Sequence, residues 1–317
     1  MMNRKWLFLA SALLALPAAA SEQKGVTLDA GFRRDNLDWS IAGNNNSPNV
    51  ISELTWRDLN IFQVKGELAG SNVDKYYFRA SFDHGWVLSG ENQDSDYAGD
   101  DRTLEFSRSI NGVDGSTVWD LSLGFGKEIP FGAKAQHRLI PLGGLSYHRQ
   151  SLRMTDGNQV LWNQDNALLL DPDFLPQPLG PFPGLRSSYD ATWAGLWFGA
   201  DTLLNLHERG NVLLRLEYHW KAWYSAKANW NLRDDFAHPV SFEHEAVGKG
   251  LVLGLGWSGE PVRHRWVWGA DLTYQLWTTD PGTDRTYGAN CFCYSEGPLN
   301  EVNWSSMALS LSLRREM

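Results

Sequence analysis

The segment Trp266–Leu276 reads Trp-Val-Trp-Gly-Ala-Asp-Leu-Thr-Tyr-Gln-Leu. Side chains alternate between the two faces of a β-strand, so this segment has an apolar face and a polar face. The apolar face comprises Trp266, Trp268, Ala270, Leu272, Tyr274 and Leu276, and the polar face includes Arg265, Asp271, Thr273 and Gln275. Repetition of this pattern along the chain, with aromatic residues at the ends of the apolar faces, predicts the lipid-facing wall of a transmembrane β-barrel.

Ten segments of strand length can be placed along the chain. They span residues 24–41, 51–69, 75–90, 115–127, 136–155, 187–205, 211–228, 246–258, 262–279 and 301–314. Short connections follow the even-numbered segments, and longer ones, including roughly 90–114, 156–186, 229–245 and 280–300, follow odd-numbered segments. Outer-membrane barrels have this alternation of short periplasmic turns and long outer loops. The predicted fold is all-β, a ten-stranded antiparallel transmembrane barrel with long outer loops, formed by residues 21–317 as one domain.

Residues 1–20 have the features of a secretion signal. Arg4 and Lys5 give a positive start, residues 6–16 form an apolar core, and Ala18–Ala20 favours cleavage before Ser21. No later stretch approaches the eighteen or so apolar residues that a membrane helix needs. We therefore expect export through a cleaved signal peptide to the outer membrane of a Gram-negative bacterium.

Composition and charge limit the classes of partner. The chain has 16 Trp and 10 Tyr, as expected for aromatic girdles at the two membrane surfaces. Its formal net charge is −9, and loss of the two positive charges of the signal peptide leaves −11. Nucleic-acid binding requires a basic face and is not expected. Cationic peptides or proteins would be attracted.

The chain has only two cysteines, Cys291 and Cys293. Export permits a disulfide, but a spacer of one residue makes a strained ring. Zinc sites usually need two further ligands, and no second paired motif is present. A tight local bridge and two separate loop thiols both stay open, and we predict no metal and no cofactor.

Two predicted outer loops carry the residues most suited to chemistry. Asp94 and Asp96 are one residue apart, so they can share a proton or orient a water molecule. In the loop near residue 235, Asp234 and Asp235 precede His238, and an Asp beside a His can form a general base. These loops lie on opposite walls of a ten-stranded barrel, so the two groups could face each other across a water-filled cleft. A solvated or weakly calcium-binding acidic loop is the simpler alternative.

The sequence here resembles the omptins, which are outer-membrane endopeptidases with ten-stranded barrels. Residues 52–57 are similar to the omptin Ser-x-Leu-x-Trp segment, and Asp94–Tyr97 is similar to the catalytic Asp-x-Asp-Trp. Phe182–Gly184, with Tyr189 and Gly195, looks like the third loop and sixth strand of the family. The resemblance implies a water molecule activated between an Asp pair and an Asp–His couple, with cleavage beside basic residues. It also implies lipopolysaccharide binding on the outer wall, for which the candidates are Arg149, Arg153 and Arg186.

One motif departs from the omptin pattern. The omptin histidine follows its aspartate by two residues, whereas the residue two after Asp235 is Ala237 and the residue two after Asp234 is Phe236. His238 is one residue further, and a shift of one residue turns a strand side chain to the opposite face. A complete site would need a bulge that redirects His238, or the use of His244 in its place.

These observations favour an omptin-like surface barrel with an acidic extracellular cleft, which binds ligands or partners or is structural and has a degraded proteolytic site. The chain also resembles the Protochlamydia-type outer membrane proteins. One alternative is an omptin-type aspartic endopeptidase cleaving at basic residues, and another is a narrow passive pore, although ten strands enclose little free space. The expected partners of this monomer are membrane lipid, lipopolysaccharide and cationic peptides or host or surface proteins. The candidate catalytic residues are Asp94, Asp96, Asp234, Asp235 and His238.

Overall fold

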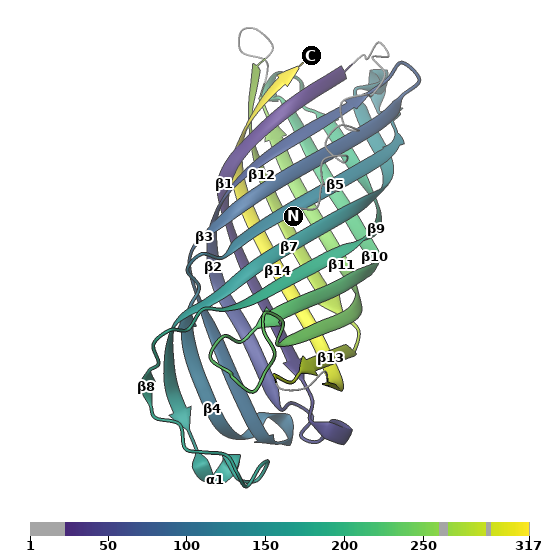
Figure 1. The fold of residues 1–317 in the computed structure, drawn as a ribbon. Helices are drawn as coiled ribbons and strands as arrows, with labels where there is room; N and C mark the ends of the chain where they lie inside the picture. Colours follow the sequence, from purple (N-terminus) through teal and green to yellow (C-terminus); the bar gives the residue numbers. More distant parts are fainter. Residues whose placement is uncertain (1–22, 260–265, 290–292, 317) are drawn as a thin grey trace, which may run out of the picture.

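The strands form one antiparallel sheet that closes into a tilted barrel (Figure 1). The computed structural model describes residues 23–259, 266–289 and 293–316, so the predicted signal peptide, its cleavage site and Cys291 lie outside the described residues. The elements are β1 Gln23–Ile41, β2 Ser52–Ser71, β3 Tyr76–Gly99, β4 Thr103–Gly112, β5 Thr117–Lys127, β6 Ile129–Phe131, β7 His137–Trp162, α1 Gln164–Ala167, β8 Gly180–Pro181, β9 Ser187–Asn205, β10 Asn211–Asn229, β11 Phe242–Ser258, β12 Trp266–Thr279, β13 Gly282–Tyr287 and β14 Tyr294–Glu316.

The ring has ten strand positions. Pairing of β1 with β14, from Gly25 opposite Glu316 to Ile41 opposite Leu299, closes it. Two positions are divided along their length, since β4 and β5 together occupy the place between β3 and β7, and β12 and β13 together occupy the place between β11 and β14. The prediction of an all-β, ten-stranded antiparallel barrel is confirmed.

Several strands run further outward than the sequence indicated. The segment 90–114, predicted as a loop, is instead a hairpin of β3 and β4 with its tip at Asp100–Arg102, and much of 280–300 is the hairpin of β13 and β14. The stretch Glu91–Asp96 is polar on both faces, so it has no alternation of hydrophobicity to reveal a strand. Backbone pairing still forms the ladder, because every strand amide needs a partner.

Short and long connections lie at opposite ends of the barrel. Residues 72–75 and 206–210 make short turns, and pairing of Gln23 with Ser71 puts the first of these beside the start of β1. The C-terminus lies at this same end, and α1, β8 and β13 lie at the other (Figure 1). By the rule that outer loops are long, the end that carries α1 faces the exterior.

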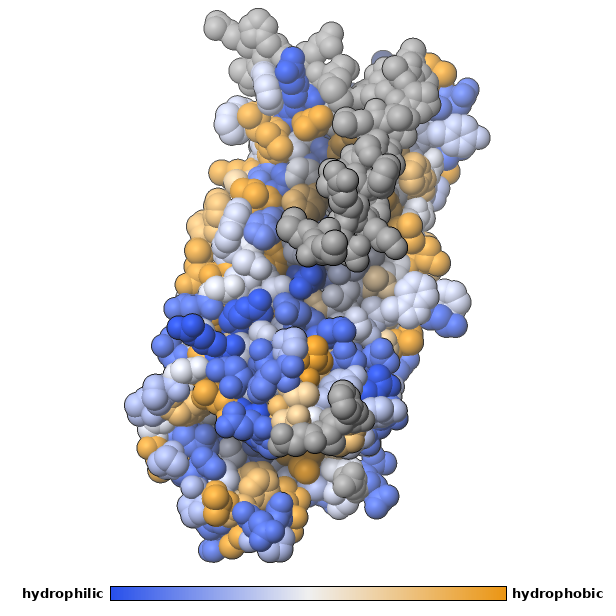
Figure 2. Space-filling model, viewed as in Figure 1, coloured by the Kyte–Doolittle hydropathy of each residue, from blue (hydrophilic) through white to orange (hydrophobic). Residues whose placement is uncertain are grey.

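The outer wall alternates in hydrophobicity as predicted. On β14, Met307, Leu309 and Leu311 are exposed, whereas Ala308 and Ser310 between them are buried. Figure 2 shows hydrophobic residues over the half of the barrel nearer the C-terminus and a largely hydrophilic zone beyond it. Alternation of this kind matches lipid outside and a polar interior.

Buried ion pairs fill the interior at the level of the apolar wall. Arg33 donates hydrogen bonds to both carboxylate oxygens of Asp35 at 2.7 and 2.6 Å and to Asp120 at 2.6 Å. A second arginine, Arg79, pairs with Asp201 at 2.8 Å and with Glu217. These charges are compensated inside the barrel, which is the condition under which buried charges are tolerated.

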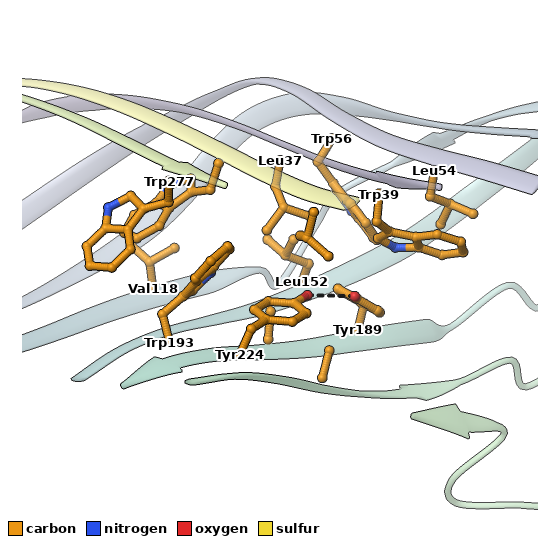
Figure 3. Close-up of a cluster of buried hydrophobic side chains, with 14 of the residues drawn as sticks. Leu37, Trp39, Leu54, Trp56, Val118, Leu152, Tyr189, Trp193, Tyr224 and Trp277 are labelled. Carbon is orange, nitrogen blue, oxygen red and sulfur yellow. Dashed lines mark hydrogen bonds between the residues drawn. The ribbon is translucent and has the colours of Figure 1, made fainter. Parts of the chain in front are cut away.

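Aromatic side chains fill the interior further outward, as Figure 3 shows. Tyr189 stacks on Trp39 and Trp56, with ring centroids 5.9 and 5.3 Å apart, and the hydroxyls of Tyr189 and Tyr224 are hydrogen-bonded at 2.7 Å. These side chains come from β1, β2, β9 and β10 on different sides of the ring, so they meet across the interior. The packed aromatic layer therefore separates the outer mouth from the charged layer.

Replacement of Arg33 by Met should lower the free energy of unfolding by about 3–5 kcal/mol, because Asp35 would stay buried without its counter-charge and Asp120 would keep only its contact with His148. Arg34→Met is the matched control. Arg34 is exposed and pairs with exposed Asp58, so its loss should cost only about 0–1 kcal/mol. Urea unfolding of the refolded barrel in lipid vesicles measures both, and equal losses would contradict the role given to the buried ion pairs.

Candidate functional site

The carboxyl groups of Asp94 and Asp96 face the interior at the outer end of the barrel. Asp94 is opposite Leu54 on β2, and Asp96 is opposite Ser52. Leu54 is buried in the internal core, and residues opposite each other in a ladder share a face. The predicted acidic pair therefore projects from β3 into the mouth, above the aromatic layer.

Both carboxyl groups of this acidic pair have raised pKa values. Burial and the neighbouring charge of Asp96 hold the pKa of Asp94 well above its usual range. Burial also raises the pKa of Asp96, although hydrogen bonds from Ser52 on β2 and Ser107 on β4 act in the opposite direction. Two carboxylates this close cannot both ionise freely, so the pair retains a proton more readily than an isolated aspartate would.

Arg233, on the connection between β10 and β11, opposes the acidic pair from another side of the mouth. Its positive charge acts on both carboxyl groups and lowers the pKa of each against the effect of burial. The guanidinium donates two hydrogen bonds to Asp235, at 2.8 and 2.7 Å, and lies 4.3 Å from the ring centroid of Phe236. The paired guanidinium holds the pKa of Asp235 below its usual range.

The predicted Asp–His couple is not assembled with His238. The Nδ1 atom of His238 is hydrogen-bonded to Asn229 at 2.7 Å, and the side chain is exposed. Within the described part of the chain no ion pair joins His238 to Asp234 or Asp235. The side chain of Asp234 is exposed, and that of Asp235 pairs with Arg233. The backbone amide of residue 236 donates to the carbonyl of Arg233 in a turn, and this turn places the arginine and Asp235 together.

His244, the other candidate histidine, lies in a buried cluster with Tyr189 and Asp284. Its Nδ1 accepts from or donates to the hydroxyl of Tyr189 at 2.8 Å, and its Nε2 lies 3.2 Å from Asp284 on β13. The ring is fully buried against Trp39 and Phe242. An Asp–His couple thus exists, but it lies inside the aromatic layer and not at the solvent-filled mouth.

Sequence reasoning missed Arg233 and Asp284. The spacing of Arg233 and Asp235, two residues apart, was visible and could have suggested an ion pair. The contact of Asp284 with His244 depends on the register of β13 against β11. The sequence predicts a loop over 280–300, so this register could not be predicted from it. Among the described residues no cluster of three or more His, Cys, Asp or Glu could hold a metal ion.

On the outer wall, two of the arginines considered for lipopolysaccharide converge. Arg149 and Arg153 each lie 3.6 Å from Asp190 on β9. Arg186, directly before β9, is exposed. Of the two cysteines, Cys293 is disulfide-bonded, and Cys291 is outside the described residues.

Residues 27–317 match the model of the Protochlamydia outer membrane protein family. The chain belongs to this family. Membership establishes an outer-membrane protein, and it agrees with the closed barrel and its apolar wall. Among the parts of the chain that the structure describes, no helix is long and apolar enough to cross a membrane. No curated protein sequence matches this member of the family.

Solved structures match this barrel to different degrees. The outer membrane protease OmpT from Escherichia coli superposes with a TM-score of 0.72 at 11% sequence identity, over 96% of this chain and 99% of that chain. A Pseudomonas aeruginosa FadL homologue gives a TM-score of 0.31 at 9% identity, over 93% of this chain and 90% of that chain. The translocator domain of NalP from Neisseria meningitidis gives a TM-score of 0.35 at 10% identity, over 92% of this chain and 88% of that chain. Similarity to the protease at this identity concerns the fold alone.

The acidic pair should make stability depend on pH. The pKa of Asp94 is raised on folding, so the native state binds more protons than the unfolded state, and stability is lost as pH rises through the folded-state pKa. We expect unfolding in urea to require more free energy at about pH 5 than at about pH 7, with the difference reduced in Asp94→Asn.

Asp234→Asn serves as the control for this titration, because Asp234 is an exposed carboxylate of the same mouth. It should keep the pH dependence of the wild type. An Asp94→Asn variant whose unfolding free energy rises between about pH 7 and about pH 5 as much as that of the wild type would contradict the raised pKa.

Proposed function

We propose that this protein is a surface barrel whose acidic mouth binds cationic groups of peptides or partner proteins, without hydrolysing them. The observation that carries the proposal is the pairing of Asp94 and Asp96, with raised pKa values, around the positive charge of Arg233. A site that already stabilises one guanidinium has the charge and the shape to accept another. Among the described residues His238 and Asp235 are engaged by other side chains, which favours binding over catalysis.

Endopeptidase activity, the first alternative, needs a histidine that removes a proton from water beside the acidic pair. His238 is engaged with Asn229, and Asp235 is neutralised by Arg233. The buried couple of His244 and Asp284 has no access to a peptide. These contacts support a degraded proteolytic site.

A narrow passive pore, the second alternative, has less support. The aromatic layer of Trp39, Trp56 and Tyr189 packs across the interior, and the ion pairs of Arg33 and Arg79 fill the next layer. A barrel of ten strands has room for its own side chains and little more.

The proposal includes export through a cleaved signal peptide of residues 1–20 and function as a monomer in the outer membrane. Lipopolysaccharide is the proposed lipid partner. The convergence of Arg149 and Arg153 on the outer face supports it, because paired arginines suit phosphate groups.

Binding of a fluorescent Arg-Arg peptide to refolded protein with lipopolysaccharide tests the main proposal. Asp96→Asn should weaken binding roughly tenfold, since it removes a carboxylate that faces the ligand. Arg233→Ala should strengthen binding about threefold to tenfold, because the competing internal cation is lost. Lys227→Ala, which removes an exposed cation paired with Glu243, is the control and should change little.

The same peptide in fluorogenic form distinguishes binding from proteolysis. We expect no hydrolysis above background. Hydrolysis by the wild type that disappears in both Asp96→Ala and His238→Ala would establish the endopeptidase and overturn the proposal. Binding that is equal in wild type and Asp96→Asn would exclude the acidic mouth as the site.

Planar-bilayer recordings test the pore alternative. We expect no steady open channels from the folded, heat-modifiable barrel, because the aromatic layer closes the interior. Steady channels at neutral pH would show that this layer opens, and they would favour a transport function.

A further inference from the structure

The outermost loop of the barrel exposes leucine side chains far from the lipid-facing wall. Residues 163–186, here called the leucine loop, connect β7 to β9 and include α1 and β8, which Figure 1 places at the end opposite the C-terminus. Four leucines are exposed by 40–74%, namely Leu168, Leu169, Leu175 and Leu179. Hydrophobic residues also appear at this tip in Figure 2. Apolar side chains gathered in water mark interaction surfaces more often than chance exposure.

Ring packing and hydrogen bonds hold the first half of the leucine loop in place. The rings of Phe106, Trp162 and Phe174 pack together. The ring centroid of Phe106 lies 5.9 Å from that of Trp162 and 5.7 Å from that of Phe174, and the last two are 6.4 Å apart. Gln164 accepts a hydrogen bond from the indole of Trp162 at 3.0 Å and donates one to the carbonyl of Phe174 at 2.7 Å. Asn166 donates to the carbonyl of Glu105 on β4 at 3.0 Å. Phe174 is thus partly covered by this packing, whereas Leu168, Leu169, Leu175 and Leu179 stay exposed.

The second half is also held in place. β8 pairs with β7, with Gly180 opposite Gln159, and the amide of Phe182 donates to the carbonyl of Gly157 at 2.9 Å. Proline at 172, 176 and 178 fixes φ through the intervening segment. A surface ordered before binding loses little entropy when a partner docks, which favours affinity.

The charge of the leucine loop restricts the partner. Asp165, Asp171 and Asp173 are exposed among the leucines, and the one basic residue of the loop, Arg186, lies at its end, directly before β9. An anionic membrane surface would be repelled, and so would the same loop of a second copy. The complementary surface has apolar side chains beside positive ones.

We propose that the leucine loop docks a basic amphipathic segment of another protein, with its apolar side chains against the leucines and its lysines or arginines near the three aspartates. This surface is separate from the acidic mouth, and it does not depend on the function proposed there. The leucines are the anchors, and the aspartates select for a cationic partner.

The test uses the full mature chain in phosphatidylcholine nanodiscs and a fluorescent amphipathic peptide of leucine and lysine, about 18 residues or five helical turns long. Anisotropy should show that Leu169→Ser/Leu175→Ser binds at least about tenfold more weakly than wild type, because two apolar side chains that the docked peptide would cover are lost. Asp171→Asn/Asp173→Asn should weaken binding less and reduce its dependence on salt. Val73→Ser, at an exposed apolar residue of a short turn, should bind as wild type does.

Four results would overturn the proposal. One is equal affinity of wild type and the double leucine variant, and another is equal affinity for a peptide with glutamate in place of lysine. The third is binding by empty nanodiscs as strong as by the protein, which would assign the peptide to lipid. Loss of binding in Asp94→Asn/Asp96→Asn but not in the leucine variant would place the peptide in the acidic mouth and also reject the leucine loop. Both leucines are exposed, so heat-modifiability should show an intact barrel in the double variant.

Discussion

Closure of the sheet by the β1–β14 ladder is the constraint on which the rest of this protein depends. A strand that crosses a bilayer must satisfy every backbone amide and carbonyl inside the protein, and only a closed ring does so. Ten positions make a ring so narrow that opposite walls touch through their side chains, as Trp39 of β1 touches Tyr189 of β9. The interior is consequently a core, with ion pairs in one layer and aromatic rings in the next.

This filled interior gives the outer mouth its rigidity. The β2–β3 ladder continues past register shifts near Asn60 into the hairpin beyond the membrane, so the position of Asp94 on β3 follows from the register of these strands. The aromatic layer closes the floor of the mouth, and water can reach the acidic pair only from outside. Burial between the aromatic floor and the facing strands accounts for the raised pKa values of these two carboxyl groups.

The sequence was informative wherever one face of a strand meets lipid. Leu309 and Leu311 on β14 could be assigned to the wall, because the alternation of polarity there follows from the bilayer itself. Beyond the membrane both faces of a strand meet water or polar groups, and the signal disappears, so the hairpin of β3 and β4 was expected as a loop. The acidic pair was predicted from the closeness of its two residues in the sequence, in a segment expected to be a loop that the structure shows as part of β3. The contact of Asp284 with His244 joins separate strands, so its prediction required a register that no local pattern encodes.

Arg233 offsets part of the negative charge gathered at the mouth. Three carboxyl groups, those of Asp94, Asp96 and Asp235, share this guanidinium, and only Asp235 holds it by two hydrogen bonds. The acidic pair is therefore stabilised through space without being saturated. An arriving cation could add to the pair without first breaking the bond of Arg233 to Asp235. A histidine in the place of this arginine would have to remain neutral to act as a base, and three surrounding carboxyl groups would favour its protonated form. The permanent charge of arginine is compatible with the cation binding that we propose for this mouth.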